Sequence, residues 1–400
     1  MPETLRVGIA GAGFAARFHW KGYRKVYGVP LQVVGVTSKT AASREAFGRE
    51  FGCRAFASFE ELCEQSDVVD ICAPGFLHER LAVAALERGK HVIIEKPFTG
   101  YYGPDGAKEE AFCGNTFPKE VMLREALASC HRMLEAARKS GKRLGYAENW
   151  VYAPAIQKER EILEKTGGQI LWLMGDESHS GSHSPYYGIW RFSGGGAIVG
   201  KGCHPLTAAL YLKRAERPSA NGQPIRPATV SARTHEITRL PAFRDAGCLR
   251  TNYEDIEDYG QMHVTFTDGT VADIFATELV LGGVHNWLEV FANNHRTRCN
   301  LNPINAVETY NPREELFRDI YVTEKIGTKQ GWSQPAPDED WQHGYPQEFQ
   351  DFAESFYQDR EPQASGELAR DTVAVLYSAY LSAERHGAEV AVPLSADGVN

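Results

Sequence analysis

The 400-residue sequence lacks the features that mark several large classes of protein. It contains no apolar run approaching the roughly 18 residues that a membrane span needs, so we expect no membrane protein. Acidic residues outnumber basic ones by 52 to 43, so the chain lacks the basic excess with which nucleic-acid binders hold phosphates. No charged-then-apolar leader precedes the first apolar run, and we expect a cytoplasmic protein.

The eight cysteines are scattered, and no two of them form a C-x-x-C pair. Disulfide frameworks belong mainly to small secreted proteins, and zinc sites need clustered ligands. We therefore expect reduced thiols and no metal. The 42% hydrophobic and 24% charged content is typical of a folded protein, and the length suffices for two or three domains of roughly 150 residues.

The first 150 residues alternate strand and helix patterns. Short apolar runs predict buried parallel strands at 5–10, 31–37, 68–73, 91–95 and 143–147. Helical patterns lie between them, and a Ser58/Glu61 capping box predicts the start of one helix. This α/β order predicts a Rossmann-type, doubly wound parallel sheet in a first domain, residues 1–150. Residues 99–120, rich in Gly and Pro, interrupt the pattern as an insertion, and a long helix is expected at 121–139.

From residue 151 onward the pattern changes to long strands with few helices. Strand-like stretches occur at 169–177, 229–237, 259–267, 270–281 and 287–293. Asp268-Gly269 predicts a two-residue hairpin turn. We predict a second α+β domain, residues 151–400, with a large open, mostly antiparallel sheet. Two closing helices, near 346–357 and 367–386, are expected to pack back toward the first domain.

The segment Gly11-Ala12-Gly13-Phe14-Ala15-Ala16 follows a predicted strand and opens a helix. This is the dinucleotide-binding fingerprint, with Ala at the third glycine position. Gly11 would form the tight turn, Gly13 would let the backbone approach a pyrophosphate, and Phe14 and Ala15 would present the helix N-terminus. We predict a dinucleotide site, the alternative being a glycine-rich turn of an unrelated α/β fold.

The second strand ends in Thr37-Ser38-Lys39 without the acidic residue that commonly binds the 2′-hydroxyl of NAD. Lys39 could pair with a 2′-phosphate and Ser38 could donate to it. This favours NADP slightly over NAD, and NAD remains open because the two residues can also form an exposed turn.

Glu95-Lys96-Pro97 directly follows the predicted strand 91–95. In doubly wound sheets, ligands bind at the carboxyl ends of the strands. Partial desolvation beside a cationic nicotinamide would lower the pKa of Lys96 and suit it to proton transfer or to binding a substrate hydroxyl. The alternative is a solvated turn lysine.

Together these residues resemble the glucose–fructose oxidoreductase / inositol dehydrogenase family (Gfo/Idh/MocA). Four segments carry the resemblance, namely 11–16, 73–78, 95–97 and 190–204. The resemblance implies catalytic roles for Lys96 and His204, a cis Pro97, and a cofactor contact from the loop Pro74 to His78 beside Glu95 and Lys96. It also implies a homodimer or homotetramer through the open sheet.

One position departs from the family pattern. The family usually carries Asp four residues before this histidine, whereas here Gly200 precedes Lys201-Gly202-Cys203-His204. We expect His204 to lack the carboxylate that would orient it and raise its pKa. Lys201 could contribute a cation instead.

A polar stretch from Ser178 to Tyr187 follows a predicted strand. Its imidazoles and hydroxyls suit a polyhydroxylated ligand, the alternative being a polar surface loop. The expected substrate-binding residues are Lys96, Glu148, His179, His183, Tyr186, Arg191, Lys201 and His204. His179 and His183 have helical metal-ligand spacing, but Gly181 and the serines favour a loop, so no metal is expected.

The leading hypothesis is an NAD(P)-dependent oxidoreductase acting on a secondary alcohol or ketone of a sugar, cyclitol or sugar derivative. Hydride would pass between the carbinol carbon and the nicotinamide. A second hypothesis is a glycoside-cleaving enzyme that uses bound NAD(H) through a keto intermediate. A third is a non-catalytic dinucleotide sensor, which the pairing of Lys96 and His204 disfavours.

Overall fold

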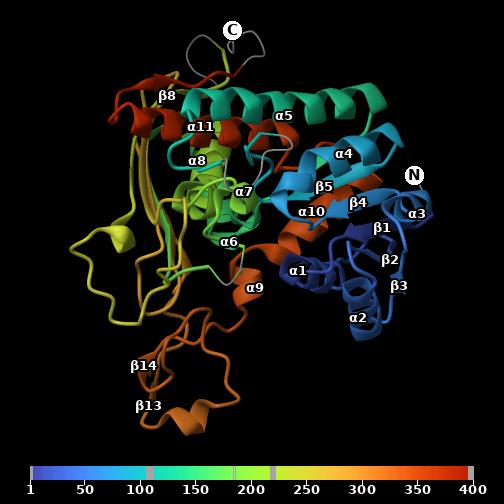
Figure 1. Ribbon diagram of the computed structural model, residues 1–400, viewed down its shortest axis with the longest axis horizontal. Coiled ribbons are helices and arrows are strands. Elements are labelled where there is room, and N and C mark those ends of the chain that lie inside the picture. The colour runs from blue at the N-terminus through green and yellow to red at the C-terminus, as the bar shows by residue number, and fades with distance from the viewer. Residues whose placement is uncertain (1–2, 105–111, 183, 185, 217–221, 395–400) are drawn as a thin grey trace.

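A six-stranded parallel sheet forms the N-terminal half of the protein, as Figure 1 shows on its right side. The structure is a computed structural model that describes residues 3–104, 112–182, 184, 186–216 and 222–394. The strands follow the order β3-β2-β1-β4-β5-β6, and every neighbouring pair is parallel. They are β1 (Leu5–Ala10), β2 (Leu31–Thr37), β3 (Arg54–Ala55), β4 (Val68–Ile71), β5 (His91–Glu95) and β6 (Leu144–Ala147). The predicted Rossmann-type sheet is confirmed.

Helices connect these strands. They are α1 (Phe14–Tyr23), α2 (Ala41–Phe51), α3 (Phe59–Gln65), α4 (His78–Glu87) and α5 (Lys119–Ser140). The predicted capping box opens α3, because Ser58 Oγ accepts from the Glu61 amide at 3.1 Å and Glu61 Oε2 accepts from the Ala57 amide at 3.1 Å. The predicted insertion separates β5 from α5, and its residues 105–111 lie outside the described part of the chain.

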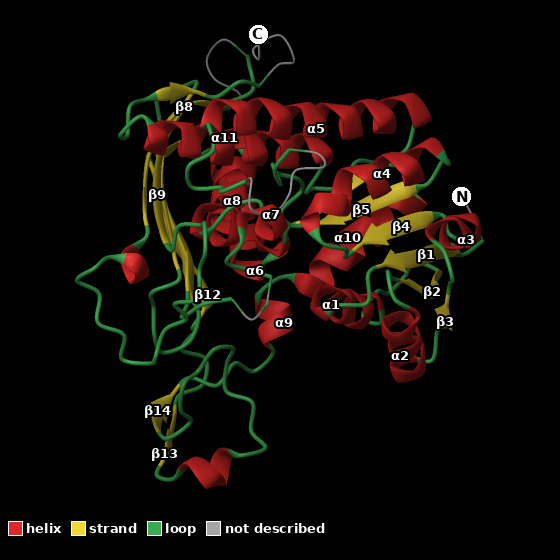
Figure 2. Ribbon diagram, in the orientation of Figure 1, coloured by secondary structure: helices red, strands yellow, loops and turns green. Residues whose placement is uncertain are grey.

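A second, seven-stranded sheet lies apart from the first (Figure 2) and follows the order β12-β11-β7-β10-β9-β8-β15. Its strands are β7 (Ile170–Ser178), β8 (Pro227–His235), β9 (Tyr259–Phe266), β10 (Val271–Thr277), β11 (His285–Ala292), β12 (Arg296–Asn302) and β15 (Val390–Ala391). The sheet is mostly antiparallel, as predicted. The predicted Asp268-Gly269 turn joins β9 to β10, but its loop has three residues, 267–269, instead of two, because Phe266 pairs with Thr270 and Gly269 takes a left-handed φ of 83°. The pair β7–β10 is parallel, so both strands end at the same edge.

Helices join the two sheets. They are α6 (Pro154–Thr166), α7 (Trp190–Ser193), α8 (Cys203–Ala215), α9 (Glu339–Gln342), α10 (Tyr345–Tyr357) and α11 (Gly366–Glu384). Helix α8 packs on β7, α10 packs on α1, and α11 packs on both α5 and β8. The two closing helices thus contact elements of the first 150 residues, whereas the division into domains at residue 150 stays a prediction.

Three elements of the second sheet's layer escaped the sequence analysis, namely α8, β12 and the two-residue strand β15. Helix α8 is buried from Cys203 to Lys213, so it has no polar face and shows no helical periodicity. Strand β12 is a polar edge strand, with charged side chains facing solvent. A long segment between β12 and α9 extends away from the body in Figure 1 and carries the small pair β13 (Thr309–Asn311) and β14 (Gly331–Ser333).

None of the helices in the described ranges is long and apolar enough to cross a membrane. All eight cysteines are free thiols.

Tyr377 on α11 ties two loops near the carboxyl ends of the first sheet. Its hydroxyl accepts from the Tyr101 amide at 2.7 Å and donates to the Gly194 carbonyl at 2.7 Å. We expect Tyr377→Phe to lower the free energy of unfolding by about 1–3 kcal/mol, because two buried backbone groups lose their partner. Urea denaturation followed by circular dichroism measures this. Tyr357→Phe, at the partly exposed end of α10, is the control, and equal small losses in both variants would contradict the assigned role.

Candidate active site

The turn after β1 contains two glycines with different reasons for being glycine. Gly11 has φ +127°, and a Cβ there would lie 2.4 Å from the Cys72 carbonyl oxygen, so the fold itself requires glycine. Gly13 has an ordinary φ of −87°, and a Cβ there would meet nothing within 4 Å. Because neither backbone strain nor packing demands glycine at position 13, the open space in front of the α1 N-terminus fits a pyrophosphate.

Phe14 and Ala15 form the first turn of α1, and the Phe14 side chain is 66% exposed. Beyond β2, Lys39 is exposed and the Ser38 hydroxyl donates to the Thr40 carbonyl at 3.2 Å. Arg44, which the sequence analysis missed, donates to the Ser38 carbonyl at 3.3 Å. Two cationic side chains therefore flank the end of β2.

The loop from Pro74 to His78 follows β4 at the same edge of the sheet. His78 is buried, with Nε2 2.8 Å from the Ala73 carbonyl and Nδ1 3.0 Å from the Pro97 carbonyl. Both ring nitrogens are thus engaged by the backbone, and burial lowers the pKa of the imidazole. The structure gives His78 the role of joining two loops, in place of the expected direct contact with a nucleotide.

Lys96 follows β5, and the Lys96–Pro97 peptide is cis, as the resemblance implied. Its ammonium donates to the Gly200 carbonyl at 3.0 Å. Burial works to lower the pKa of Lys96, but the negative charges around it, including the carboxylates of Glu177 and Glu95, outweigh burial and raise the pKa above its usual value. The protein's own charges therefore hold Lys96 as a cation, and the expected lowering of its pKa beside a bound nicotinamide stays a prediction.

The Glu95 side chain points toward α1 and away from Lys96. Its Oε1 lies 3.3 Å from His19 Nε2, and His19 Nδ1 lies 2.8 Å from Asp70. Burial works to raise the pKa of Glu95, but His19 outweighs it and lowers the pKa below its usual value. Glu95 therefore belongs to a buried charged chain beneath the cofactor turn.

His204 lies at the start of α8 and is flanked by two carboxylates. Its Nδ1 lies 2.5 Å from Glu148 Oε1, and its Nε2 lies 3.7 Å from Glu177 Oε2. Glu148 is fully buried and follows β6, whereas Glu177 is the next-to-last residue of β7. Trp150 stacks on the imidazole, with the ring centroids 6.1 Å apart. Histidine and carboxylates from three elements thus meet beside Lys96.

This arrangement corrects the expectation that Gly200 deprives His204 of a carboxylate, because Glu148 supplies one. Tyr187 occupies the space beside Gly200, and a Cβ at position 200 would lie 2.7 Å from the Tyr187 hydroxyl. An aspartate at position 200 could therefore enter only if Tyr187 moved.

Lys201 forms a buried ion pair with Glu278, which follows β10. Burial lowers the pKa of Lys201 in spite of this partner. His179 Nδ1 lies 3.9 Å from Glu278 Oε2. The structure thus places His179 and Lys201 together around Glu278, next to the group that contains Lys96 and His204.

Glu257 organises the glycine-rich segment that precedes His204. Its carboxylate accepts from the amides of Gly196 at 3.1 Å and Ile198 at 2.9 Å, and from the Tyr380 hydroxyl at 2.7 Å. Burial raises the pKa of Glu257 to about 7. Neither Glu257 nor Glu177 was predicted, although Glu177 stands at the carboxyl end of a predicted strand, as Lys96 does.

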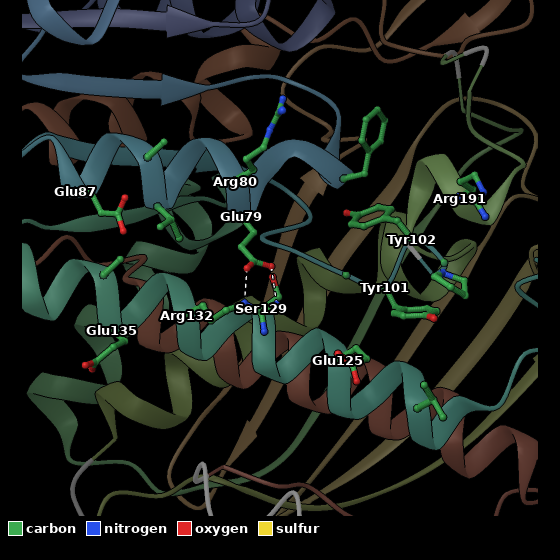
Figure 3. A pocket seen from close by; sticks show the side chains of 18 of the residues that line it. Glu79, Arg80, Glu87, Tyr101, Tyr102, Glu125, Ser129, Arg132, Glu135 and Arg191 are labelled. Atoms are coloured by element: carbon green, nitrogen blue, oxygen red, sulfur yellow. Dashed lines mark hydrogen bonds and ion pairs between the residues drawn. The ribbon is translucent and has the colours of Figure 1, made fainter. Parts of the chain in front are cut away.

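Arg191 lies elsewhere, against the loop of residues 101–103 and 5.4 Å from the Phe112 ring. It lines a groove of about 1320 Å³ between α4 and α5, where Glu79 and Arg132 pair at 2.9 Å, as Figure 3 shows. Tyr186 is 63% exposed and packs on Phe192. The structure therefore does not bring Arg191 close to Lys96, Glu148 and His204. His183 lies outside the described residues.

Ligand atoms of Glu148, Cys203 and His204 lie within 4.8 Å of one another, close enough to hold a metal ion. Burial raises the pKa of the Cys203 thiol well above its usual value, which opposes the thiolate that a metal would bind. The Glu148–His204 hydrogen bond already engages one ligand atom of each of the other two residues, Oε1 and Nδ1.

Comparison with known proteins supports the assignment of the first sheet. Residues 5–109 match the sequence profile described as "Oxidoreductase family, NAD-binding Rossmann fold" (GFO_IDH_MocA). The chain is 36% identical over 95 residues to UDP-N-acetylglucosamine 3-dehydrogenase of Acidithiobacillus ferrooxidans, covering 24% of this chain and 29% of that protein. It is 26% identical over 226 residues to levoglucosan dehydrogenase of Pseudarthrobacter phenanthrenivorans, covering 52% of this chain and 51% of that protein. The matches thus span about half, or less, of these relatives' lengths.

The fold continues beyond those matches. The crystal structure of GenD2 from gentamicin A biosynthesis in complex with NAD superposes with a TM-score of 0.77 at 21% identity, covering 98% of this chain and 97% of that chain. This likeness extends to both sheets.

We expect Gly13→Val to abolish dinucleotide binding while the protein stays folded, because the branched side chain fills the space in front of the α1 N-terminus without touching the protein. Fluorescence titration with NADH and NADPH measures the affinity, and circular dichroism checks the fold. Gly327→Val is the control, because a Cβ at Gly327 also meets nothing within 4 Å. Unchanged titration of a folded Gly13→Val protein would overturn the assignment.

Proposed function

We propose that the chain is an NAD(P)-dependent oxidoreductase acting on a secondary alcohol or ketone of a sugar, cyclitol or sugar derivative, because residues 5–109 match the profile of the Gfo/Idh/MocA oxidoreductase family. One observation carries this proposal. Lys96 and the Glu148–His204 pair lie together at the carboxyl-end edge of the first sheet, the edge that also carries the glycine turn. A bound nicotinamide would supply the hydride acceptor. Proton transfer and substrate positioning fall to this chain's own residues.

His204 is the proposed proton acceptor. Glu148 accepts from Nδ1–H, which leaves Nε2 as the basic nitrogen. Glu177, 3.7 Å from Nε2, stabilises the imidazolium once the ring has taken the hydroxyl proton.

Lys96 is the proposed electrostatic partner of the substrate oxygen. Its ammonium is fixed by the Gly200 carbonyl, which accepts one of its three protons, and the others can be donated to the substrate. Because its pKa is raised, Lys96 stays charged through the neutral range and loses its contribution only at strongly alkaline pH. The two side chains thus divide the work between base and cation.

We expect His204→Asn and Lys96→Met each to lower kcat by about 10²–10⁴-fold, because each removes a group that acts on the substrate hydroxyl. Cofactor affinity should change little. Glu148→Gln removes the charge that stabilises the imidazolium, so kcat should fall in this variant as well. Steady-state kinetics with a polyol panel across pH measures these effects.

The matched control is Glu159→Gln, since Glu159 is also fully buried and accepts from an imidazole, His295 Nε2, at 2.8 Å. It should leave kcat unaltered. A wild-type rate and profile in His204→Asn would rule out the proposed base.

The cofactor is NADP or NAD, and the two cations at the end of β2 favour NADP slightly. Lys39 is exposed, and Arg44 lies beside the Ser38 carbonyl, so both can reach a 2′-phosphate.

We expect Lys39→Ala to weaken NADPH binding by about 1–3 kcal/mol, as for a lost hydrogen bond to a charged group, and to leave NADH binding nearly unchanged. Calorimetric titration with both cofactors distinguishes these outcomes. Lys25→Ala, a second surface lysine beyond α1, is the control. An equal loss for NADH and NADPH would argue against a 2′-phosphate contact.

We also propose a cytoplasmic homodimer or homotetramer formed through the open face of the seven-stranded sheet. Trp172 and Phe291 stack there with ring centroids 4.4 Å apart, and both are only partly buried. Helix α8 covers the opposite face, where Pro205 packs beside Gly175. The stacked aromatic rings lie among paired charges, including His263–Asp273 and His285–Asp176, and this mixture of aromatic and polar side chains suits a subunit interface.

A further inference from the structure

Among the described residues around His204, the carboxylates match the cations in number, and two of the three cations are held by a carboxylate. We call Lys96, Glu148, Glu177, Lys201, His204 and Glu278 the His204 cluster. Each of its cationic side chains has a protein acceptor, since Lys201 pairs with Glu278, His204 with Glu148, and Lys96 with the Gly200 carbonyl. Sites that bind phosphate or carboxylate groups instead present several guanidinium, ammonium or amide donors, whereas in this cluster Lys96 is the one cation whose acceptor is neutral.

The same cluster offers acceptors that the protein leaves unused. Oε2 of Glu148 and Oε2 of Glu177 are buried, and neither has a hydrogen-bond partner within the protein. Glu148 is 0% exposed and Glu177 is 8% exposed. Buried carboxylate oxygens without donors are strongly unfavourable, so a ligand that brings donors would satisfy them.

Glu177 is the carboxyl group of the cluster that most needs a hydrogen-bond donor. Burial raises its pKa above the usual value, against the nearby cations His204, Lys96 and Lys201. Its carboxyl group therefore gains most from a hydroxyl or ammonium donor and would oppose a further negative charge.

We propose that the site selects a polyol ring that carries no anionic group, either neutral or bearing an amine, and discriminates against ring phosphates and uronates. This inference rests on the proposed function and narrows its substrate class. Ring hydroxyls or an ammonium would donate to Glu148 Oε2 and Glu177 Oε2, whereas a phosphate or carboxylate on the ring would face these buried carboxylates at short range.

The test compares four probes that share one ring: D-glucose, D-glucosamine, D-glucose 6-phosphate and D-glucuronate. Calorimetry measures their binding to the enzyme saturated with reduced cofactor, and initial rates with oxidised cofactor measure turnover. We expect the neutral or the amine probe to bind at least about 100-fold more tightly than either anionic probe, as like charges at short range imply. Glu177→Gln should shrink this ratio, whereas Glu159→Gln, a buried carboxylate outside the cluster, should preserve it.

Two failures can be told apart. If no probe is oxidised although cofactor binds, the proposed function fails, and the order of binding affinities still judges the inference about charge. If either anionic probe binds as tightly as glucose, or if none of the four binds, the inference is overturned. An unchanged ratio in Glu177→Gln would overturn it as well.

Discussion

The hydrogen bond between Glu148 and His204 is the constraint on which the arrangement of the site depends. Glu148 follows the last strand of the parallel sheet, and His204 begins the helix that covers the second sheet. Both side chains are buried, so removing either partner would leave an uncompensated polar or charged group in the interior. The pair therefore fixes the imidazole and joins the two halves of the molecule at one point.

Strand direction explains why the other charged groups gather there. Lys96 follows a parallel strand of the first sheet, and the parallel pair β7–β10 in the second sheet brings Glu177 and Glu278 to one edge. Had β7 and β10 been antiparallel, one of these carboxylates would stand at the far end of the sheet. The parallel pair β7–β10, the exception in a mostly antiparallel sheet, thus places two carboxylates of the site.

Much of the fold follows from local pattern. Strands β1, β2 and β5 have the bounds that their apolar runs predict, and the capping box and the position of the Asp268-Gly269 turn are local signals that hold. Helix α8 could not be found this way, because a helix buried on all sides has no polar face to mark its period. Sequence patterns thus reveal elements with one solvent-exposed face more readily than elements that are buried on all sides.

The candidate site divides in the same way. Gly11, Gly13 and Lys96 stand in recognisable motifs at strand ends. The Glu148–His204 pair joins residues 56 positions apart, and neither spacing nor composition encodes it. The raised pKa of Lys96 has the same origin, because carboxylates from other elements outweigh the burial that local reasoning considered.

The packing of Tyr187 against Gly200 constrains how this sequence can change over evolution. A side chain at position 200 collides with the tyrosine ring, so the two positions cannot vary independently. An acid can be accepted at position 200 only once Tyr187 has moved or has been replaced by a smaller residue. Since Glu148 already binds the His204 imidazole, such an acid would be a second, competing partner for this ring. Position 148 could then accept other residues.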